Sequence, residues 1–443
     1  MNVREVTLAE ILDARERRAE LQKKLLSEYH STLISFTMNI AGPIKNTPLI
    51  DRSFRYGLSL LFDRLPKSKL LFECSSSLPQ GCEAFIAVDL NAEDVKDICV
   101  EFEESSRLGR LFDMDVIDQS GKKLERKRER ACIVCGKSGR ECAAGRLHPV
   151  KEIIDVTTNI MTEHFAREDA RCIGELAVEC LIREVETTPK PGLVDLRNNG
   201  SHTDMDVSTF RKSALSLKPY FIECVTIGIE SKGQAPAQIF SRLREAGLRA
   251  EATMYEATNG VNTHKGLIYS MGVLLGAIGR HWTADRPITD RDSILSEASS
   301  LVSESAKTDL DSAKGSTAGE RLFLEYGLKG IRGEVASGFL SVLNHSLPVY
   351  EEALKKGLSP NDAGVCSLLK LISAIDDTNL YHRGGAEGVR FAKEYASRLL
   401  DAEFDSEAVE AMDDEFIRRK LSPGGSADLL AITYFLYSLE KMK

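Results

Sequence analysis

Residues 173–195 read IGELAVECLIREVETTPKPGLVD, and the pattern of the chain changes at this stretch. Its apolar residues recur with helical spacing, at Ile173, Leu176, Ala177, Cys180 and Leu181. Pro189 ends the expected helix, because proline lacks the N–H that a helix interior needs. From about residue 160 onward we find helical periodicity and no strand signals, so we expect an all-α C-terminal domain.

Further helical patterns follow, over residues 207–230, 236–258, 264–279, 291–307, 316–328, 335–356, 361–375, 386–402 and 426–441. Residues 1–150 instead alternate helix and strand signals. Thr7 and Glu10 form a capping box at the start of a long amphipathic helix. Runs rich in β-branched and aromatic residues predict strands over 32–40, 83–90 and 111–117. We therefore expect two domains, an α+β domain over residues 1–160 and a helical domain over 165–443, with the boundary near 150–168.

The composition is that of a globular protein of two or three domains: 443 residues, 42% hydrophobic and 28% charged. The net charge of −9 argues against a nucleic-acid partner, since such binding depends on a basic surface. No apolar run approaches the ~20 residues of a membrane helix, and the N-terminus lacks the apolar segment of a signal peptide. We expect a cytoplasmic protein with no membrane partner.

The segment GRLFDMDV over residues 109–116 places Asp113 and Asp115 two positions apart on an expected strand. Alternate residues of a strand point to one face, so both carboxylates can bind Mg²⁺ on a triphosphate. Arg110 would add positive charge for a pyrophosphate leaving group. Asp89, at the end of the preceding strand, is a candidate third carboxylate. A solvated strand face is the alternative explanation of this pattern.

A cluster of metal-binding residue types follows the expected third strand, at Cys132, Cys135, Cys142 and His148. Thiolates and imidazole suit a closed tetrahedral Zn²⁺ site, whereas ordinary thiols in a loop are the alternative. Residues 122–151 are also locally basic. This segment is either a solvated face or a docking site for a phosphate-rich ligand or an acidic protein, and charge reversal of Arg126 and Arg128 would distinguish the two.

Four polar clusters interrupt the helical half, and several lie where helices are expected to begin. Free N–H groups and the helix dipole favour phosphate at such ends. The first cluster contains Glu186, Lys190, Asp195, His202 and Asp204; the second Asn262, His264 and Lys265; the third Arg332 and Glu334; the fourth Asp376, Asp377, Asn379 and Arg383. Helix caps, turns and structural histidines explain each cluster equally well when it is taken alone.

The strings LDARERRAELQKKLL, LISFTMNIAGPIK and GRLFDMDV, with the CxxC segment, resemble holo-citrate lyase synthase over residues ~5–155. Ala41 departs from the proline expected there. The resemblance implies nucleotidyltransferase-like chemistry. A serine of the apo-citrate lyase acyl-carrier (gamma) subunit would attack the α-phosphorus of a triphosphate and expel pyrophosphate. Asp113, Asp115 and Arg110 would be the catalytic residues.

The strings ETTPKPGLVD, GVNTHKG, IRGE, DDTN with HRGG, and SPGGSADLL resemble triphosphoribosyl-dephospho-CoA synthase over about residues 165–443. The resemblance implies that the 2′-hydroxyl of dephospho-CoA attacks the ribose C1 of ATP and that adenine leaves. Glu186, Asp195 or Asp204 would stabilise the oxocarbenium-like state or act as base. Asp376 and Asp377 would hold Mg²⁺, and the remaining cluster residues would bind substrate: Lys190, His202, Asn262, His264, Lys265, Arg332, Glu334, Asn379 and Arg383.

The two resemblances together predict one chain that makes an activated prosthetic group and then attaches it. The same chemistry in malonate decarboxylase maturation is an alternative, although the RERR…TMNIAGP opening favours citrate lyase. A metal-dependent scaffold without catalysis is a further alternative, and active Asp113→Ala and Asp376→Ala variants would favour it.

Overall fold

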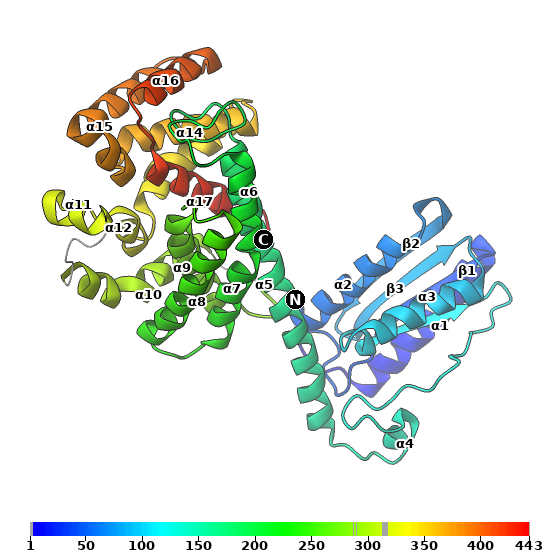
Figure 1. Ribbon diagram of the computed structural model, residues 1–443. Helices are drawn as coiled ribbons and strands as arrows, with labels where there is room; N and C mark the ends of the chain where they lie inside the picture. Colours follow the sequence, from blue (N-terminus) through cyan, green and yellow to red (C-terminus); the bar gives the residue numbers. More distant parts are fainter. Residues whose placement is uncertain (1–2, 287, 289, 312–317, 443) are drawn as a thin grey trace. The chain divides into compact units, whose positions relative to one another are not determined.

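The computed structural model describes residues 3–442 except 287, 289 and 312–317, and the chain divides into two compact units, Met1–Ala166 and Arg167–Lys443 (Figure 1). The first unit combines helices with one antiparallel sheet, and the second is helical. The expected arrangement of an α+β half followed by a helical half is confirmed. None of the helices in the described ranges is long and apolar enough to cross a membrane.

The first unit holds four strands and the helices that cover them. Its elements are α1 (Leu8–Tyr29), β1 (Thr32–Met38), α2 (Pro48–Arg64), η1 (Lys67–Lys69), β2 (Leu70–Leu78), β3 (Gly81–Val88), α3 (Ala92–Ser105), η2 (Gly109–Leu111), β4 (Phe112–Ile117) and α4 (Gly139–Ala144). The three strands expected from sequence are β1, β3 and β4. The serine-rich β2 was not predicted, because serine is a poor strand former.

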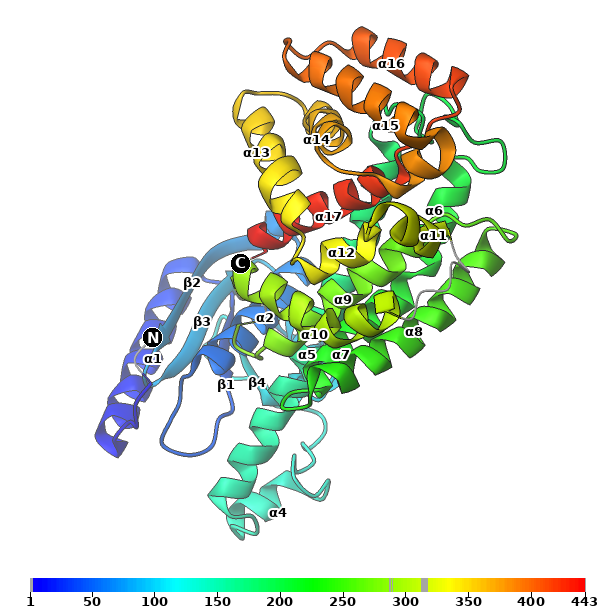
Figure 2. The same cartoon turned by 90° about the vertical axis from the view of Figure 1, so that its left-hand side faces the viewer.

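The sheet has the strand order β2-β3-β1-β4, which makes β4 an edge strand. One face is apolar, with Phe36, Ile86 and Met114 in a core shared with α2 and α3. The other face packs on α1 through Leu25 and Phe85. Figure 2 shows α1 and α2 on opposite sides of the sheet.

Helix α1 begins as the sequence predicts, with Thr7 accepting from the Glu10 N–H and the Glu10 carboxylate accepting from the Thr7 N–H. Its sheet-facing side is not uniformly apolar. Arg18 and Gln22 follow the spacing of Leu25 and reach polar side chains of the sheet. A helix normally turns apolar residues toward a sheet, so these two mark a polar site between α1 and the strands.

Helix α5 (Val150–Glu186) is one continuous helix of 37 residues, and the division between the two units falls within it. The sequence analysis identified helical spacing only from Ile173 and a boundary near 150–168. The helix begins earlier, and Ile160, Met161 and Phe165, all buried, continue its apolar spacing toward the N-terminus.

The second unit surrounds two buried helices, α9 (Lys265–His281) and α17 (Gly424–Lys441). The others are α6 (Val207–Ser216), α7 (Lys218–Glu230), α8 (Pro236–Ala257), α10 (Arg291–Asp311), α11 (Ala318–Tyr326), α12 (Gly330–Ala336), η3 (Val342–Ser346), α13 (Leu347–Lys355), α14 (Pro360–Ala374), α15 (Thr378–Leu400) and α16 (Ser406–Arg418). The first two residues of the helix expected over 316–328 lie outside the described residues.

Three helix predictions differ from the structure. The expected helix 207–230 is two helices, since Pro219 opens α7. The expected helix 335–356 is broken after Ala336, where Gly338 and Phe339 adopt positive φ. Helix α15 begins at Thr378 rather than 386, with a kink at Gly385, and α16 was not predicted.

Candidate active sites

The two carboxylates of β4 lie on the sheet face that α1 covers. Asp113 is paired in register with Thr37 of β1, and Asp115 is paired with Ser35. Burial, followed by the like charge of Asp115, raises the pKa of Asp113. Arg130 Nη1 is 3.8 Å from Asp113 Oδ1, and Lys123 Nζ is 2.5 Å from Asp115 Oδ2. Two carboxylates on one strand face, with the pKa of Asp113 raised, fit the binding of a cation.

Polar side chains continue from these carboxylates across the sheet toward α1. Arg18 donates to Glu83 Oε2 at 3.0 Å, and Gln22 donates to Ser35 Oγ at 3.0 Å. Glu83 is the register partner of Thr37 on the strand beyond it, so Asp113, Thr37 and Glu83 form one row. The sheet thus presents both signs of charge beside Asp113.

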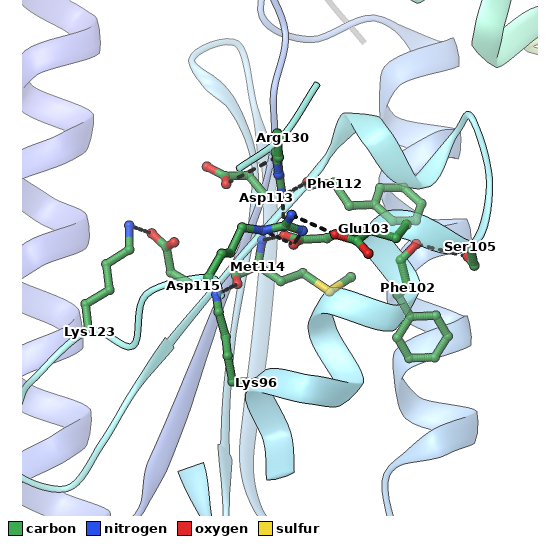
Figure 3. A network of polar contacts seen from close by, with 12 residues as sticks. Lys96, Phe102, Glu103, Ser105, Phe112, Asp113, Met114, Asp115, Lys123 and Arg130 are labelled. Carbon is green, nitrogen blue, oxygen red and sulfur yellow. Dashed lines mark hydrogen bonds and ion pairs between the residues drawn. The ribbon is translucent and has the colours of Figure 1, made fainter. Parts of the chain in front are cut away.

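Glu103 of α3 holds Arg130 at the edge of the sheet, as Figure 3 shows. Its buried carboxylate accepts from the Met114 N–H at 2.7 Å and contacts Arg130 Nη2 at 2.5 Å. It also pairs with Arg126, while Arg110 donates to the Ala131 carbonyl at 2.6 Å. Burial, then Arg130 and Arg126, lowers the pKa of Arg110, which indicates that three guanidinium groups lie close together. Guanidinium groups beside Asp113 suit the binding of an anion.

Two expectations for this half need correction. Asp89 does not join the carboxylate pair: it bonds Lys69 at 2.7 Å and follows Val88, whose register partner Thr32 is at the opposite end of β1 from Thr37. Arg126 is not a free docking residue, because its side chain is 17% exposed and pairs with Glu103 and Glu104. Reversing its charge would place a third acidic group beside two others, so it cannot test docking.

Cys132, Cys135, Cys142 and His148 converge, with one ligand atom from each lying within 4.8 Å of all the others. The Cys132–Gly136 turn is closed by the Gly136 N–H bonding to the Cys132 carbonyl at 2.9 Å, with Gly136 at φ +74°. His148 Nδ1 is 3.3 Å from Glu152 Oε2, and its buried Nε2 has no hydrogen-bond partner in the described part of the chain. A histidine oriented in this way by a carboxylate is typical of metal ligands.

In the second unit, a cavity of about 940 Å³ collects most of the predicted polar clusters. Helices α9 and α17 both begin at this cavity, and neither N-cap residue, His264 or Pro423, caps its helix with a side chain. The Lys265 N–H donates to Asn262 Oδ1 and the Ser426 N–H donates to Asp377 Oδ2, while the helix dipoles still favour phosphate at these ends. The predicted residues that line the cavity are Lys190, His202, Asp204, Asn262, His264, Lys265, Glu334, Asp376, Asp377, Asn379 and Arg383.

Three predicted residues are not among those that line the cavity: Glu186, Asp195 and Arg332. Glu186 Oε1 is 2.5 Å from Arg211 Nη2, and Asp195 is buried, with only 2% of its surface exposed. The Asp195 carboxylate accepts from the N–H groups of Lys190, Arg197 and Asn198. Asp195 therefore holds the loop after α5 in shape.

Asp377 caps α15 and accepts four hydrogen bonds. Oδ1 accepts from the Asn379 and Leu380 N–H groups, and Oδ2 accepts from the N–H and Oγ of Ser426. These donors occupy the carboxylate, so Asp377 fits a structural role better than the Mg²⁺ role expected from sequence. Asp376 Oδ1 bonds Lys393 Nζ at 2.7 Å.

Two histidines of the cavity are held in different ways. His202 Nε2 is 2.9 Å from Ser422 Oγ, and its Nδ1 faces Arg383 at 3.3 Å. His264 is 1% exposed and bonds Ser213 Oγ through Nδ1 at 2.7 Å. Burial, then Lys190, lowers the pKa of His264 to about 3, so it is neutral at ordinary pH.

Sequence reasoning missed Glu184 and Asp428, which also line the cavity. Lys190 Nζ bonds Glu184 Oε1 at 2.5 Å, and both side chains are buried. Burial, followed by the charges of Glu184 and Asp377, raises the pKa of Asp428 well above its usual range. Asp428 lies within SPGGSADLL, so the motif itself was the available signal.

Comparisons with known proteins agree with this division. Residues 6–164 match the family model CitX, apo-citrate lyase phosphoribosyl-dephospho-CoA transferase, and residues 170–443 match CitG, ATP:dephospho-CoA triphosphoribosyl transferase. "Protein CitXG" of Haemophilus influenzae is 37% identical, covering 98% of this chain and 96% of that protein. "Protein CitXG" of Leuconostoc mesenteroides subsp. cremoris is 34% identical over 98% of this chain and 97% of its own length.

A relative with one activity matches the second unit alone. The 2-(5''-triphosphoribosyl)-3'-dephosphocoenzyme-A synthase of Pectobacterium atrosepticum is 40% identical over 64% of this chain and 94% of its own length. Two transferase models, each matching one part of the chain, define a bifunctional transferase. The chain belongs to the family of fused CitXG proteins, which combine synthesis and attachment of the citrate lyase prosthetic group.

Proposed function

We propose that each unit carries one of the two activities at the site described above. The cavity of the helical unit makes 2'-(5''-triphosphoribosyl)-3'-dephospho-CoA from ATP and 3'-dephospho-CoA. The β4 site of the α+β unit then transfers phosphoribosyl-dephospho-CoA to a carrier serine. The observation that carries this proposal is the separation of the polar residues into two groups, each within a single unit that matches a single family model.

The cavity suits a triphosphate and a second nucleotide substrate. The N-termini of α9 and α17 would receive phosphate oxygens, and Lys265 and Arg383 would add positive charge. The 2′-hydroxyl of dephospho-CoA would attack C1 of the ribose, and adenine would leave. Since the transition state carries positive charge on the sugar, carboxylates of the cavity would stabilise it.

The β4 site suits nucleotidyl transfer. Asp113 and Asp115 would hold Mg²⁺, which supplies charge neutralisation on the transferring and leaving phosphates. Arg110 and Arg130 would bind the departing pyrophosphate, because both guanidinium groups lie in the positive cluster around Glu103. Arg18 is placed across the row from Asp113 and would orient the substrate from α1.

We further propose that Cys132, Cys135, Cys142 and His148 bind a structural Zn²⁺. The convergence of the four ligand atoms and the unpartnered, buried Nε2 of His148 support this assignment. The metal would tie the loop after β4 to the start of α5. Arg126 and Arg130 come shortly before Cys132 in that loop, so Zn²⁺ would act on the β4 site by fixing the positions of these arginines.

The carrier partner is proposed to be the gamma subunit of citrate lyase, which would dock on the exposed basic residues Arg128, Lys137 and Arg140. These residues follow the β4 site in the chain and differ from Arg126 in being exposed. We place the reaction in the cytoplasm, where reducing conditions suit the ten free cysteines.

Mass spectrometry of the full chain incubated with ATP, Mg²⁺, 3'-dephospho-CoA and apo acyl-carrier subunit tests the proposal. We expect adenine release and a phosphoribosyl-dephospho-CoA adduct on the carrier. Asp113→Asn should abolish the adduct and leave adenine release intact. Adenine without an adduct in the wild-type chain would refute the assignment of the first unit, and neither product would refute both assignments.

A further inference from the structure

Three carboxylates come together at the wall of the cavity, and two of them are occupied. Glu184 is paired with Lys190, and Asp377 accepts four hydrogen bonds. Asp428 makes no hydrogen bond or ion pair with any residue that the structure describes, although it is partly exposed in the cavity. The free carboxylate among the three is therefore the one that can act on a ligand.

The position of Asp428, in α17, depends on a glycine of the neighbouring helix α9. A Cβ atom at Gly266 would lie 2.0 Å from Asp428 Oδ2, so any side chain there would displace the carboxylate. Gly266 is the second residue of α9, next to Lys265. The glycine in the string GVNTHKG thus lets a carboxylate of α17 approach the start of α9, where phosphate is expected to bind.

We propose that Asp428 is the general base of the triphosphoribosyl transfer, an inference that rests on the function proposed for this cavity. Its carboxylate takes the proton of the 2′-hydroxyl of dephospho-CoA as that oxygen forms a bond to C1 of the ATP ribose. The C1–N9 bond breaks, and its electron pair stays on adenine, which takes a proton from water. Asp428 then returns its proton to solvent.

The surroundings of Asp428 favour this role over a passive one. The negative charges of Glu184 and Asp377 act on Asp428, and both oppose its ionisation. Two lysines that line the cavity are engaged elsewhere, Lys190 with Glu184 and Lys265 with Glu251 at 2.8 Å. His264 is neutral and does not compensate the charge. Burial and the charges of Glu184 and Asp377 raise the pKa of Asp428, and a carboxylate with a raised pKa is a stronger base in its ionised form.

This inference replaces the sequence-based candidates for the same role. Glu186 and Asp195 are paired and do not line the cavity. Asp204 does line it, but it lies in the loop before α6 rather than on a buried helix. A base needs a fixed position relative to the attacking oxygen, which a helix-borne side chain such as Asp428 supplies better than a loop residue.

The test uses the full chain with the substitution Asp428→Asn. We expect kcat for adenine release to fall by ~10²- to 10⁴-fold, the range for loss of a general base. The ATP dissociation constant, measured by calorimetry, should stay within about threefold, since a base contributes little to ground-state binding. The acidic limb of the kcat–pH profile should disappear, which a structural role would not cause. Asp401→Asn, an exposed carboxylate at the end of α15, is the control and should behave as wild type.

Gly266→Ala is a second, independent test, because it keeps the carboxylate and moves it. We expect a fall in kcat similar in direction to that of Asp428→Asn. Fluorescence of Trp282, which lies in the helical unit, reports on folding of that unit. Attachment of pre-formed triphosphoribosyl-dephospho-CoA to the carrier is assigned to the other unit and should persist in both variants. Full adenine release by Asp428→Asn, or loss of its ATP binding, would overturn the assignment. A wild-type chain that releases no adenine would instead refute the function proposed for the cavity.

Discussion

Lys190 Nζ lies 2.5 Å from Glu184 Oε1, and the two side chains are only 2% and 4% exposed. The same ammonium group donates to the Glu184 carbonyl at 2.7 Å, so one lysine closes the end of α5 onto the loop that follows it. Both residues line the cavity. A buried ion pair is therefore part of the wall of the cavity.

We expect Lys190→Met to destabilise the helical unit by ~3–5 kcal/mol, because it leaves a buried carboxylate without its partner. Urea unfolding monitored by Trp282 fluorescence measures this. Trp282 is the single tryptophan of the chain and donates to Asp169 Oδ2 within the helical unit. The double variant Lys190→Met/Glu184→Gln should recover much of the loss. Equal stability of wild type and Lys190→Met would show that the pair is not closed in solution.

The acid sensitivity of the helical unit should depend on His264. Its pKa is about 3 in the folded protein, whereas an unfolded histidine titrates at ~6.5. Between these values the unfolded state binds more protons, so stability falls as the pH is lowered, by up to ~1.4 kcal/mol per pH unit. We therefore expect His264→Asn to show a smaller loss of stability between pH 7.5 and 5 than wild type, by about 2 kcal/mol.

The same Trp282 signal measures this difference. His382→Asn is the control, since His382 is exposed beside the same cavity and its removal should not change the pH slope. Identical slopes for wild type and His264→Asn would mean that His264 is hydrated in the folded protein.

Structural features that depend only on neighbouring residues in the chain were predicted from the sequence. The capping box of α1 and the alternation that places Asp113 and Asp115 on one face depend on neighbouring residues, and both are present. The sequence alone did not show which of Glu184 and Glu186 lines the cavity. Residues two apart on a helix point ~200° away from each other, so one can line the cavity while the other meets Arg211.

The role proposed for Asp428 could not be assigned from the sequence, because it depends on the packing of Asp428 against Gly266, more than 150 positions earlier in the chain. A sequence does not state which helices pack together. Asp376 and Asp377 illustrate the same limit: adjacent carboxylates look alike in sequence, but Asp377 is buried and caps α15, whereas Asp376 pairs with Lys393.

The carboxylate pair of β4 should be required for attachment alone. We expect Asp113→Asn to lower the rate of carrier modification at least ~10²-fold, since charge stabilisation of the transferring phosphate is lost. Adenine release should be unchanged, because that reaction is assigned to the other unit. Asp89→Asn is the matched control: Asp89 is exposed, pairs with Lys69 and lies at the far end of the sheet. An active Asp113→Asn chain, measured with pre-formed intermediate, would contradict the assignment.

Carrier docking should depend on exposed cations rather than on Arg126. We expect the double reversal Arg128→Glu/Lys137→Glu to raise KM for the carrier on the order of tenfold while kcat stays unchanged, because rim charges mainly affect association. Added salt should reduce the difference between wild type and variant, since exposed charges are screened. Lys23→Glu/Lys24→Glu, two exposed reversals on α1, is the matched control. Equal effects from both pairs would indicate that net charge alone matters.

The Cys132–His148 cluster should contain about one Zn²⁺ per chain in protein purified without chelator, as measured by plasma mass spectrometry. Cys142→Ser should abolish the metal, since its buried sulfur lies 3.5 Å from Cys135 Sγ within the cluster. Cys74→Ser, outside the cluster, should retain it. Replacement by Co²⁺ should give the visible absorption of a tetrahedral thiolate site, a signal independent of activity.

Because the loop that the metal closes follows the Glu103-bound arginines, metal loss should lower carrier modification and leave adenine release intact. Full zinc content in Cys142→Ser would show that the metal is bound elsewhere.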